Sequence, residues 1–191
     1  MKLVTRLLII LTPLILSGCA GFLVAGAATT ANIVTDTRTT QEIWDDNNIE
    51  LQIAGIANKA PFAEHTRITA SSYNGTVILI GQSSEQTLLD EFEARARKVK
   101  GVNTIYNQVH IKEPLSLGEI SHDSWLTTKV KSALLANSEL SGIKIKVITE
   151  DKEVFLLGYV SHRHADLAVD IARNISGVKR VIKAFQYGDE S

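Results

Sequence analysis

The sequence of 191 residues contains a single cysteine, three prolines and few aromatic residues, and its acidic and basic residues nearly balance. One cysteine cannot form an intramolecular disulfide, and it is too few for a zinc site built from paired cysteines. A formal net charge of −1 argues against a nucleic-acid-binding protein, which normally needs a strong positive excess. With 45% apolar residues the chain is too apolar to be disordered, and its length allows one or two domains.

Motifs of the common enzyme classes are also missing. The sequence has no nucleophile elbow, no P-loop and no glycine-rich nucleotide-binding fingerprint. His162, His164 and Asp166 are a weak metal signal, because they fall at an expected helix start where polar residues are common. Asp45 and Asp46 likewise fall at an expected helix start, where acidic side chains suit the helix dipole. We therefore expect neither enzyme activity nor a metal site.

The first residues have the layout of a secretory signal. Lys2 and Arg6 precede an apolar run at 7–16, which is about half the length that a membrane span needs. The run ends in Leu16-Ser17-Gly18-Cys19, and this is the only cysteine of the chain. The pattern resembles a bacterial lipobox, in which the peptide is cut before the cysteine. A membrane span over 7–28 is the alternative, and it would require Cys19 to stay unprocessed.

The lipobox resemblance implies a diacylglycerol and an acyl chain bound covalently at Cys19, and we expect no other cofactor. Ala20 follows in place of the aspartate that usually causes inner-membrane retention. The resemblance therefore implies an outer-membrane protein that faces the periplasm. Residues 1–18 are expected to form the signal peptide, and residues 19–45 the lipidated N-terminus and a tether.

The rest of the chain repeats itself. Residues 77–81 (VILIG) match residues 154–158 (VFLLG), and apolar residues at helical spacing match upstream at the same offset. We expect two domains, at 46–112 and 124–187, joined by a linker at 113–123 and followed by a tail at 188–191. Each copy is expected to fold as helix, strand, strand, helix, strand, with tight turns at Asn74-Gly75 and Asp151-Lys152. The predicted fold class is α+β: two tandem αββαβ domains, each a three-stranded mixed sheet with two helices on one face.

This pattern resembles the BON domain. The most specific elements are the apolar strand that ends in Gly81 or Gly158 and the Gly-Val pairs at 101–102 and 177–178. Residues 124–130 (SWLTTKV) and 177–181 (GVKRV) are closest to outer-membrane lipoproteins with two BON domains. The resemblance implies a non-enzymatic domain that binds phospholipid at the periplasmic face of a membrane. It also implies a role in outer-membrane integrity, with enrichment at division sites.

The two copies differ in charge and in the outer face of their first helix. Residues 45–113 carry a net charge of −2, whereas residues 124–187 carry +4, which favours an anionic lipid surface. A stripe on the first helix of the second copy suits the bilayer interface. Its expected lipid-binding residues are Trp125, Thr128, Ser132 and Leu135, flanked by Lys129 and Lys131. The equivalent residues of the first copy are Asn48, Leu51, Gly55 and Asn58, so that copy lacks the aromatic anchor at this position.

Two alternatives remain open. Trp125 follows the expected linker, so it could pack between the domains instead of facing a membrane. The protein could also be a non-enzymatic adaptor whose first domain binds a protein of outer-membrane assembly or cell-wall remodelling. The expected partners are therefore anionic phospholipid, either phosphatidylglycerol or cardiolipin, and an envelope protein, but not nucleic acid.

Overall fold

A computed structural model describes residues 38–188 of the chain, which belong to one compact unit that spans residues 32–191. The expected signal peptide, the lipidation residue Cys19, most of the tether and the last three residues lie outside the described residues. All residues of the three apolar clusters lie between positions 49 and 185. The unit 32–191 therefore contains every residue of these cores.

The first half of the described chain forms one αββαβ unit. Strand β2 is central: it pairs antiparallel with β1 and parallel with β3, so the sheet is mixed. In chain order the elements are α2 (Thr40–Ala57), the short α3 (Phe62–His65), β1 (Thr66–Tyr73), β2 (Thr76–Ser83), α4 (Gln86–Ala96) and β3 (Thr104–Ile111).

The second half repeats this unit. Strand β5 is central, antiparallel to β4 and parallel to β6. Its elements are α5 (Leu117–Ala136), a 3₁₀ turn η2 (Ser138–Leu140), β4 (Lys146–Glu150), β5 (Glu153–Val160), α6 (His162–Arg173) and β6 (Arg180–Tyr187). The predicted fold class, two tandem αββαβ domains with three-stranded mixed sheets, is confirmed.

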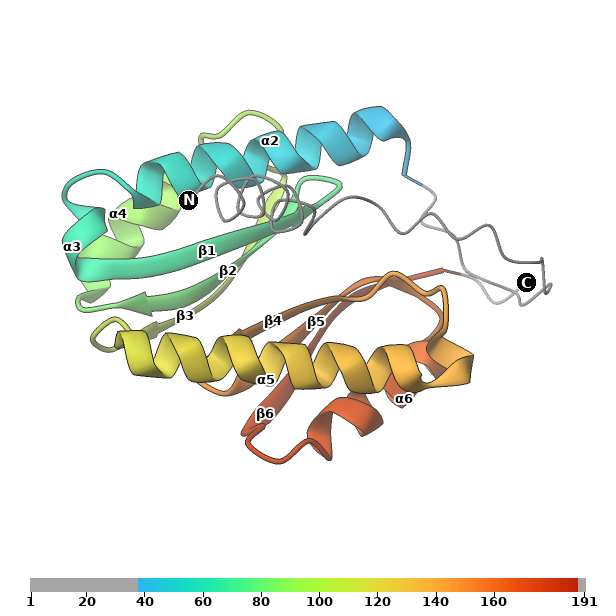
Figure 1. Ribbon diagram of the computed structural model, residues 1–191. Helices are drawn as coiled ribbons and strands as arrows, with labels where there is room; N and C mark the ends of the chain where they lie inside the picture. Colours follow the sequence, from blue (N-terminus) through green and yellow to red (C-terminus); the bar gives the residue numbers. More distant parts are fainter. Residues whose placement is uncertain (1–37, 189–191) are drawn as a thin grey trace, which may run out of the picture. The chain divides into compact units, whose positions relative to one another are not determined.

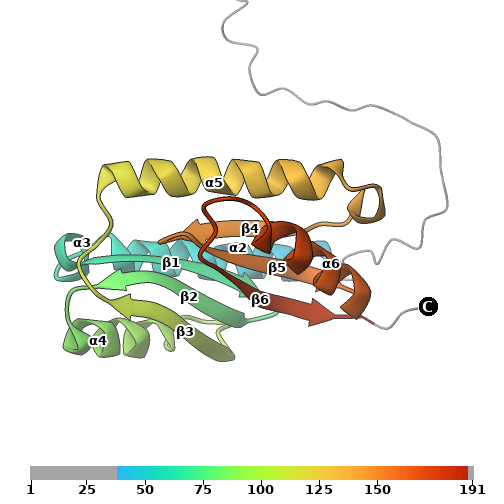
Figure 2. The ribbon, with the colours of Figure 1, turned by 90° about the horizontal axis from the view of Figure 1, so that it is seen from below.

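Each sheet has its helices on one face and the other sheet on its second face (Figures 1 and 2). Helices α2 and α4 cover the sheet β1-β2-β3 through a core that contains Ile49, Ile53, Leu79 and Phe92. Helices α5 and α6 cover the sheet β4-β5-β6 through a separate core. The layers are therefore helix, sheet, sheet, helix, and the outer faces of α2 and α5 are left to solvent.

The contact between the two sheets uses corresponding residues of the two copies. Ile78 and Ile80 of β2 pack with Phe155 and Leu157 of β5, which occupy the matching positions of the repeat. All four side chains are buried. Because each copy offers the same positions to the other, the interface has the self-complementary form of a twofold dimer contact, here made within one chain.

Ion pairs between the sheets do not follow this symmetry. The Arg67 guanidinium lies 2.7 Å from the buried carboxylate of Glu150, which also accepts a hydrogen bond from the Gln82 side chain. Burial raises the pKa of Glu150, although the bonds from Gln82 and Arg67 oppose the shift. Glu153 lies 2.8 Å from Arg180 of its own sheet and 3.2 Å from His110 of the other sheet. Together these contacts tie β1, β2 and β3 to β4 and β5.

The repeated glycine at the end of the apolar strand is required by the backbone. Gly81 and Gly158 have φ angles of 141° and 149°, which L-residues rarely adopt. A Cβ atom at Gly81 would lie 1.8 Å from the carbonyl oxygen of Arg67, and one at Gly158 would lie 2.5 Å from that of Lys144. The glycines thus let the second strand of each sheet lie very close to the backbone at the start of β1 or just before β4.

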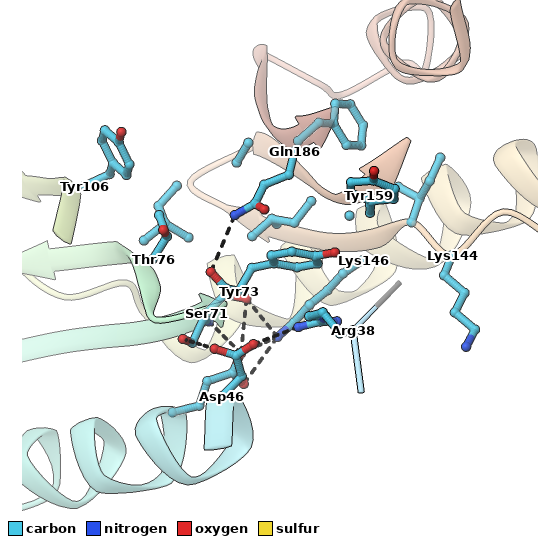
Figure 3. Close-up of a pocket in the computed structure, with 18 of the residues that line it drawn as sticks. Arg38, Asp46, Ser71, Tyr73, Thr76, Tyr106, Lys144, Lys146, Tyr159 and Gln186 are labelled. Atoms are coloured by element: carbon cyan, nitrogen blue, oxygen red, sulfur yellow. Dashed lines mark hydrogen bonds and ion pairs between the residues drawn. The ribbon is translucent and has the colours of Figure 1, made fainter. Parts of the chain in front are cut away.

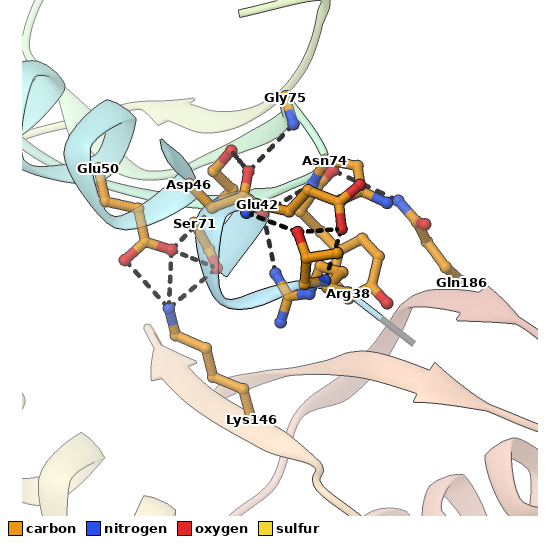
Figure 4. Close-up of polar contacts among 12 residues, drawn as sticks. Arg38, Glu42, Asp46, Glu50, Ser71, Asn74, Gly75, Lys146 and Gln186 are labelled. Carbon is orange, nitrogen blue, oxygen red and sulfur yellow. Dashed lines mark hydrogen bonds and ion pairs between the residues drawn. The ribbon is translucent and has the colours of Figure 1, made fainter. Parts of the chain in front are cut away.

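Asp46 binds the turn that joins β1 to β2. Its carboxylate accepts hydrogen bonds from the backbone N–H groups of Asn74 and Gly75, the Ser72 hydroxyl and the Arg38 guanidinium. Figure 4 shows these contacts converging on the carboxylate from the turn and from the chain before α2. Burial opposes ionisation of Asp46, but these four bonds outweigh it and hold its pKa below the usual value.

The second copy has the same device. Asp123 of α5 is buried and accepts hydrogen bonds of 2.7 and 3.0 Å from the backbone N–H groups of Asp151 and Lys152. Both turns have positive φ at their two central residues, as the predicted tight turns require. The expectation that Asp46 sits at a helix start is wrong, because α2 begins at Thr40 and places this side chain one and a half turns into the helix.

Two expected segment boundaries also differ from the structure. Thr39 and Glu42 form a capping box, so residues 40–45 belong to α2 and not to the tether. Ser116 and Glu119 form another, so α5 begins at Leu117 and takes in most of the expected linker 113–123. In both cases the helix extends about two turns before the region that the repeat defines.

The two turn-binding aspartates should dominate the stability of their domains. We expect Asp46→Ala and Asp123→Ala each to lower the free energy of unfolding by about 3 kcal/mol, because each removes the charged acceptor of two backbone N–H groups in the turn. Urea unfolding measures this, with Asp45→Ala as the matched control. Asp45 is exposed, and among residues 38–188 its side chain bonds only to Gln41, so its loss should change stability by less than about 0.5 kcal/mol. Equal effects at Asp45 and Asp46 would contradict the assignment.

The lowered pKa of Asp46 also predicts a dependence on pH. The unfolded chain binds a proton more readily at this carboxyl, so its contribution is complete above the ordinary pKa near 3.8 and is lost as the pH falls through the folded value. The stability advantage of wild type over Asp46→Asn should therefore shrink as the pH is lowered below about 4. Urea midpoints measured from pH 7 to pH 3 test this, and a gap that stays constant would show that the charge of Asp46 contributes nothing.

Candidate functional site

Helix α5 presents the predicted stripe to solvent. Trp125 is 54% exposed and Leu135 is 74% exposed, and Thr128 and Ser132 between them are exposed as well. The opposite side of the helix carries Leu126, Val130 and Leu134, which are buried against the second sheet. The alternative in which Trp125 packs between the domains does not fit this exposure.

The stripe is longer than the sequence predicted. Leu117, the first residue of α5, is 83% exposed. It precedes Leu135 by five full helical turns, so both side chains point in the same direction. The expected linker 113–123 includes Leu117, but the capping box of Ser116 and Glu119 starts the helix at this residue. The S-x-x-E spacing of that box is visible in the sequence.

Basic and aromatic side chains cluster beside Trp125. The Lys129 ammonium lies 4.4 Å from the centre of the Trp125 ring and donates a 3.2 Å hydrogen bond to the carbonyl oxygen of Ser176. His122, also assigned to the linker, has its ring centre 5.7 Å from that of Trp125. Lys131 is exposed on the other flank of the stripe, and no carboxylate in residues 38–188 pairs with either lysine.

The carboxylates of α5 are withdrawn from this surface. Glu119 is held by the cap, where hydrogen bonds from Ser116 lower its pKa, and Asp123 is buried under the β4–β5 turn. The outer face of α5 therefore combines apolar residues, small hydroxyl side chains and two lysines. That combination suits a negatively charged surface with an apolar interior.

Helix α2 has a related but differently charged surface. Trp44 is 64% exposed and Leu51 is 72% exposed, on the same face of the helix. The expectation that the first copy lacks an aromatic anchor is thus incomplete, because Trp44 lies one turn before the position compared, Asn48. Helix α2 contains four acidic residues and neither lysine nor arginine, whereas α5 has two lysines. The two helices therefore differ mainly in charge.

The residues weighed as metal ligands are engaged elsewhere. His162 stacks on Tyr187, the His164 ring contacts the Ser161 hydroxyl, and Asp166 pairs with Lys183, raising the pKa of that lysine. Within residues 38–188 no three His, Cys, Asp or Glu side chains come together in a metal-like group. In the same part of the chain no helix has both the length and the apolar character of a membrane span.

Two αββαβ units packed sheet to sheet define a tandem α+β protein, and the family follows from comparison with known sequences. The model of the BON domain matches residues 45–113 and 122–189. The chain belongs to the BON-domain family, as the repeated strand and glycine pattern indicated.

The chain is 43% identical to the outer membrane lipoprotein DolP of Haemophilus influenzae over 175 residues, which cover 91% of each protein. It is also 43% identical to the 21 kDa hemolysin of Actinobacillus pleuropneumoniae, over 75% of this chain and 74% of that protein. Identity to osmotically-inducible protein Y of Escherichia coli K12 is 29%, over 72% and 70% of the two chains. The protein is therefore a two-BON-domain relative of an outer-membrane lipoprotein.

The exposure of Trp125 predicts that it contributes little to folding. We expect Trp125→Ala to change the free energy of unfolding by less than about 1 kcal/mol, because about half of the side chain is in water. The adjacent and fully buried Leu126 is the matched control, and Leu126→Ala should cost about 3 kcal/mol. Urea unfolding of both variants measures the difference. A large loss at Trp125 would restore the interdomain-packing interpretation.

Proposed function

We propose that this protein is a lipid-anchored outer-membrane protein, facing the periplasm, whose second BON domain binds anionic phospholipid through the outer face of α5. The observation that carries the proposal is the exposed stripe from Leu117 through Trp125 to Leu135, with Lys129 and Lys131 at its sides. The proposed function is binding and not catalysis. Its proposed ligands are phosphatidylglycerol and cardiolipin, which share an anionic phosphate and two or more acyl chains.

The apolar and the basic residues of the stripe would make different contacts with the membrane. The Trp125 ring and the two leucines would enter the boundary between headgroups and acyl chains, where an indole is favoured. Each lysine near an anionic headgroup layer would contribute about 1 kcal/mol. Lys129 already lies over the Trp125 ring, so the charge and the aromatic anchor would approach the membrane together.

Acylation at Cys19 supports this proposal by making weak contacts sufficient. Three acyl chains would hold the protein in one leaflet, because each buried CH₂ contributes about 0.8 kcal/mol. A domain confined near the surface then meets lipid at a high effective concentration, so contacts through α5 would select the type of lipid region and not attachment itself. A role in outer-membrane integrity and enrichment at division sites are part of the proposal and rest on the family resemblance.

Vesicle co-sedimentation tests the lipid-binding site. Residues 32–191, which carry no acyl anchor, would be mixed with neutral phosphatidylcholine vesicles and with vesicles that contain phosphatidylglycerol, at low and physiological salt. We expect salt-sensitive binding to the anionic vesicles only, and at least a tenfold loss in Trp125→Glu, because a carboxylate replaces the aromatic anchor. Trp44→Glu is the matched control: it makes the same change at an exposed tryptophan of the other copy and should bind as wild type.

The two tryptophans offer a second, independent readout. The chain has only Trp44 and Trp125, so Trp44→Phe and Trp125→Phe each leave one fluorophore. Anionic vesicles should shift the emission of Trp125 to shorter wavelength and leave that of Trp44 unchanged, because only the first would enter the interface. Failure of every form to bind any vesicle would overturn the lipid proposal, and a shift at Trp44 alone would move the site to α2.

A protein-binding adaptor is the second candidate, and the surface of α2 favours it. Trp44 and Leu51 form an exposed apolar face on a helix that carries only acidic charges, which an anionic membrane would repel. A partner of outer-membrane assembly or cell-wall remodelling with a basic surface would suit this face. Binding to such a partner should survive Trp125→Glu and fail in Trp44→Glu, the opposite of the pattern expected for lipid.

A further inference from the structure

A cavity of about 870 Å³ opens between the two sheets at the end where the β1–β2 turn faces the start of β4. Its apolar floor continues the contact between the sheets, with Ile78, Leu157, Ile182 and Ala184. Tyr73, Tyr106 and Tyr159 stand around this floor (Figure 3). Both the volume and the combination of an apolar floor with a few polar groups are usual for a small-molecule site.

The repeat explains why this end of the interface is open. At the opposite end Arg67 of β1 pairs with Glu150 of β4, and Gln82 of β2 completes the contact. At the cavity end, the residues that correspond by the offset of the repeat are Lys144 for Arg67, Tyr73 for Glu150 and Tyr159 for Gln82. All three line the cavity. The basic residue is thus kept at the second end, but a tyrosine replaces the carboxylate.

Lys144 therefore lacks the carboxylate partner that Arg67, the corresponding residue of the first copy, has in Glu150. It is exposed at the rim of the cavity and forms no hydrogen bond or ion pair with any residue of 38–188. In Figure 3 the Lys146 ammonium lies within the network of dashed lines, whereas that of Lys144 carries none. Lys146 is already neutralised by Glu50, 3.0 Å away.

The lining of the cavity as a whole carries more cations than carboxylates. Its cations are Arg38, Lys144, Lys146 and Lys183, and its carboxylates are Asp46 and Glu50. Lys183 is paired with Asp166, which lies outside the lining, so among the four cations Lys144 alone has no carboxylate partner within residues 38–188. Both carboxylates are occupied, Asp46 by the β1–β2 turn and Arg38, and Glu50 by Lys146 and the backbone N–H of Ser72. A bound anion would therefore meet an excess of positive charge above an apolar floor.

We propose that this cavity binds a single-chain anionic amphiphile, whose acid group takes at Lys144 the place that Glu150 has at Arg67. The aliphatic chain would lie on Ile78, Leu157 and Ile182 between the two sheets, a space that admits one chain because packed sheets are only about 10 Å apart. The site is separate from the outer face of α5 and does not depend on membrane binding by that helix. A fatty acid and a monoacyl phosphate share the required chemistry.

Titration calorimetry with residues 32–191 tests the site, using probes below their micelle concentrations. Dodecanoate and dodecyl phosphate distinguish a carboxylate from a phosphate head, and dodecyldimethylamine oxide has the same chain without net charge. We expect one molecule of an anionic probe to bind per chain, and the uncharged probe to bind at least tenfold more weakly. The tighter of the two anions identifies the source of the ligand.

Variants locate the ligand in the cavity. Lys144→Glu should weaken binding of the anionic probes about tenfold and leave the uncharged probe unchanged. Lys98→Glu, the same change at an exposed lysine outside the lining, should have no effect. Gln108→Trp, which puts an indole into the cavity from β3, should abolish binding of all three probes. Trp125→Glu should bind them as wild type does, so this site and the membrane site can fail independently.

Three results would overturn the proposal. One is the absence of heat and of any bound species with every probe. Another is unchanged binding in Gln108→Trp while its unfolding curve shows that the protein is folded. The third is an equal loss of affinity in Lys144→Glu and Lys98→Glu, which would show that the probes respond only to the net charge of the protein.

Discussion

The apolar contact between the two sheets is the constraint on which the rest of this structure depends. A three-stranded sheet with helices on one face leaves its second face exposed, and a unit this small buries too little surface to be secure alone. Here the second faces of the two sheets cover each other through Ile78, Ile80, Phe155 and Leu157. That arrangement leaves the outer faces of α2 and α5 as the broad helical surfaces free to meet a partner or a membrane.

Within this frame the two copies keep their folding devices and differ in their surfaces. Both use a buried aspartate to bind the turn between the first two strands. Both also need a glycine where the backbone of the neighbouring segment comes very close. The first helix contains four acidic residues and no basic one in the first copy, whereas two lysines lie beside the exposed apolar residues in the second. The same packing requirements therefore apply to the interior of both copies, whereas they do not constrain the residues on the outer faces of the helices.

Much of the fold could be predicted from the sequence, because it depends on local periodicity and on the repeat. The order of helices and strands along each copy, the mixed three-stranded sheets and the tight turns at Asn74-Gly75 and Asp151-Lys152 agree with the structure. The helix starts are earlier than the expected ones, at the capping boxes of Thr39 and Ser116. These two residues stand at the same offset of the repeat, so the sequence contains the signal that places both starts. The sequence predicts Asp46 to be an acid that suits the helix dipole, because only tertiary packing brings its actual partners, the Asn74 and Gly75 N–H groups, to it.

The candidate site was foreseen in part for the same reason. Trp125, Lys129 and Leu135 share a helical face whatever the surrounding fold, so the sequence could place them together. Leu117 and His122 were missed because the helix was expected to begin later. The cavity at Lys144 could not be foreseen, because it depends on which faces of the two sheets meet, and no local pattern encodes that choice.

The use of matching positions on both sides of the sheet interface has a consequence for the origin of the chain. A surface that binds its own copy about a twofold axis would also join two separate single-domain chains. An ancestor with one domain would thus have formed a symmetric dimer, in which any change at one end of the contact was imposed on the other end. Once two copies are joined in one polypeptide, a substitution at one end of the contact no longer changes the other end. One end can then close with Arg67 and Glu150, while the other has Tyr73 in the place of the acid and stays open.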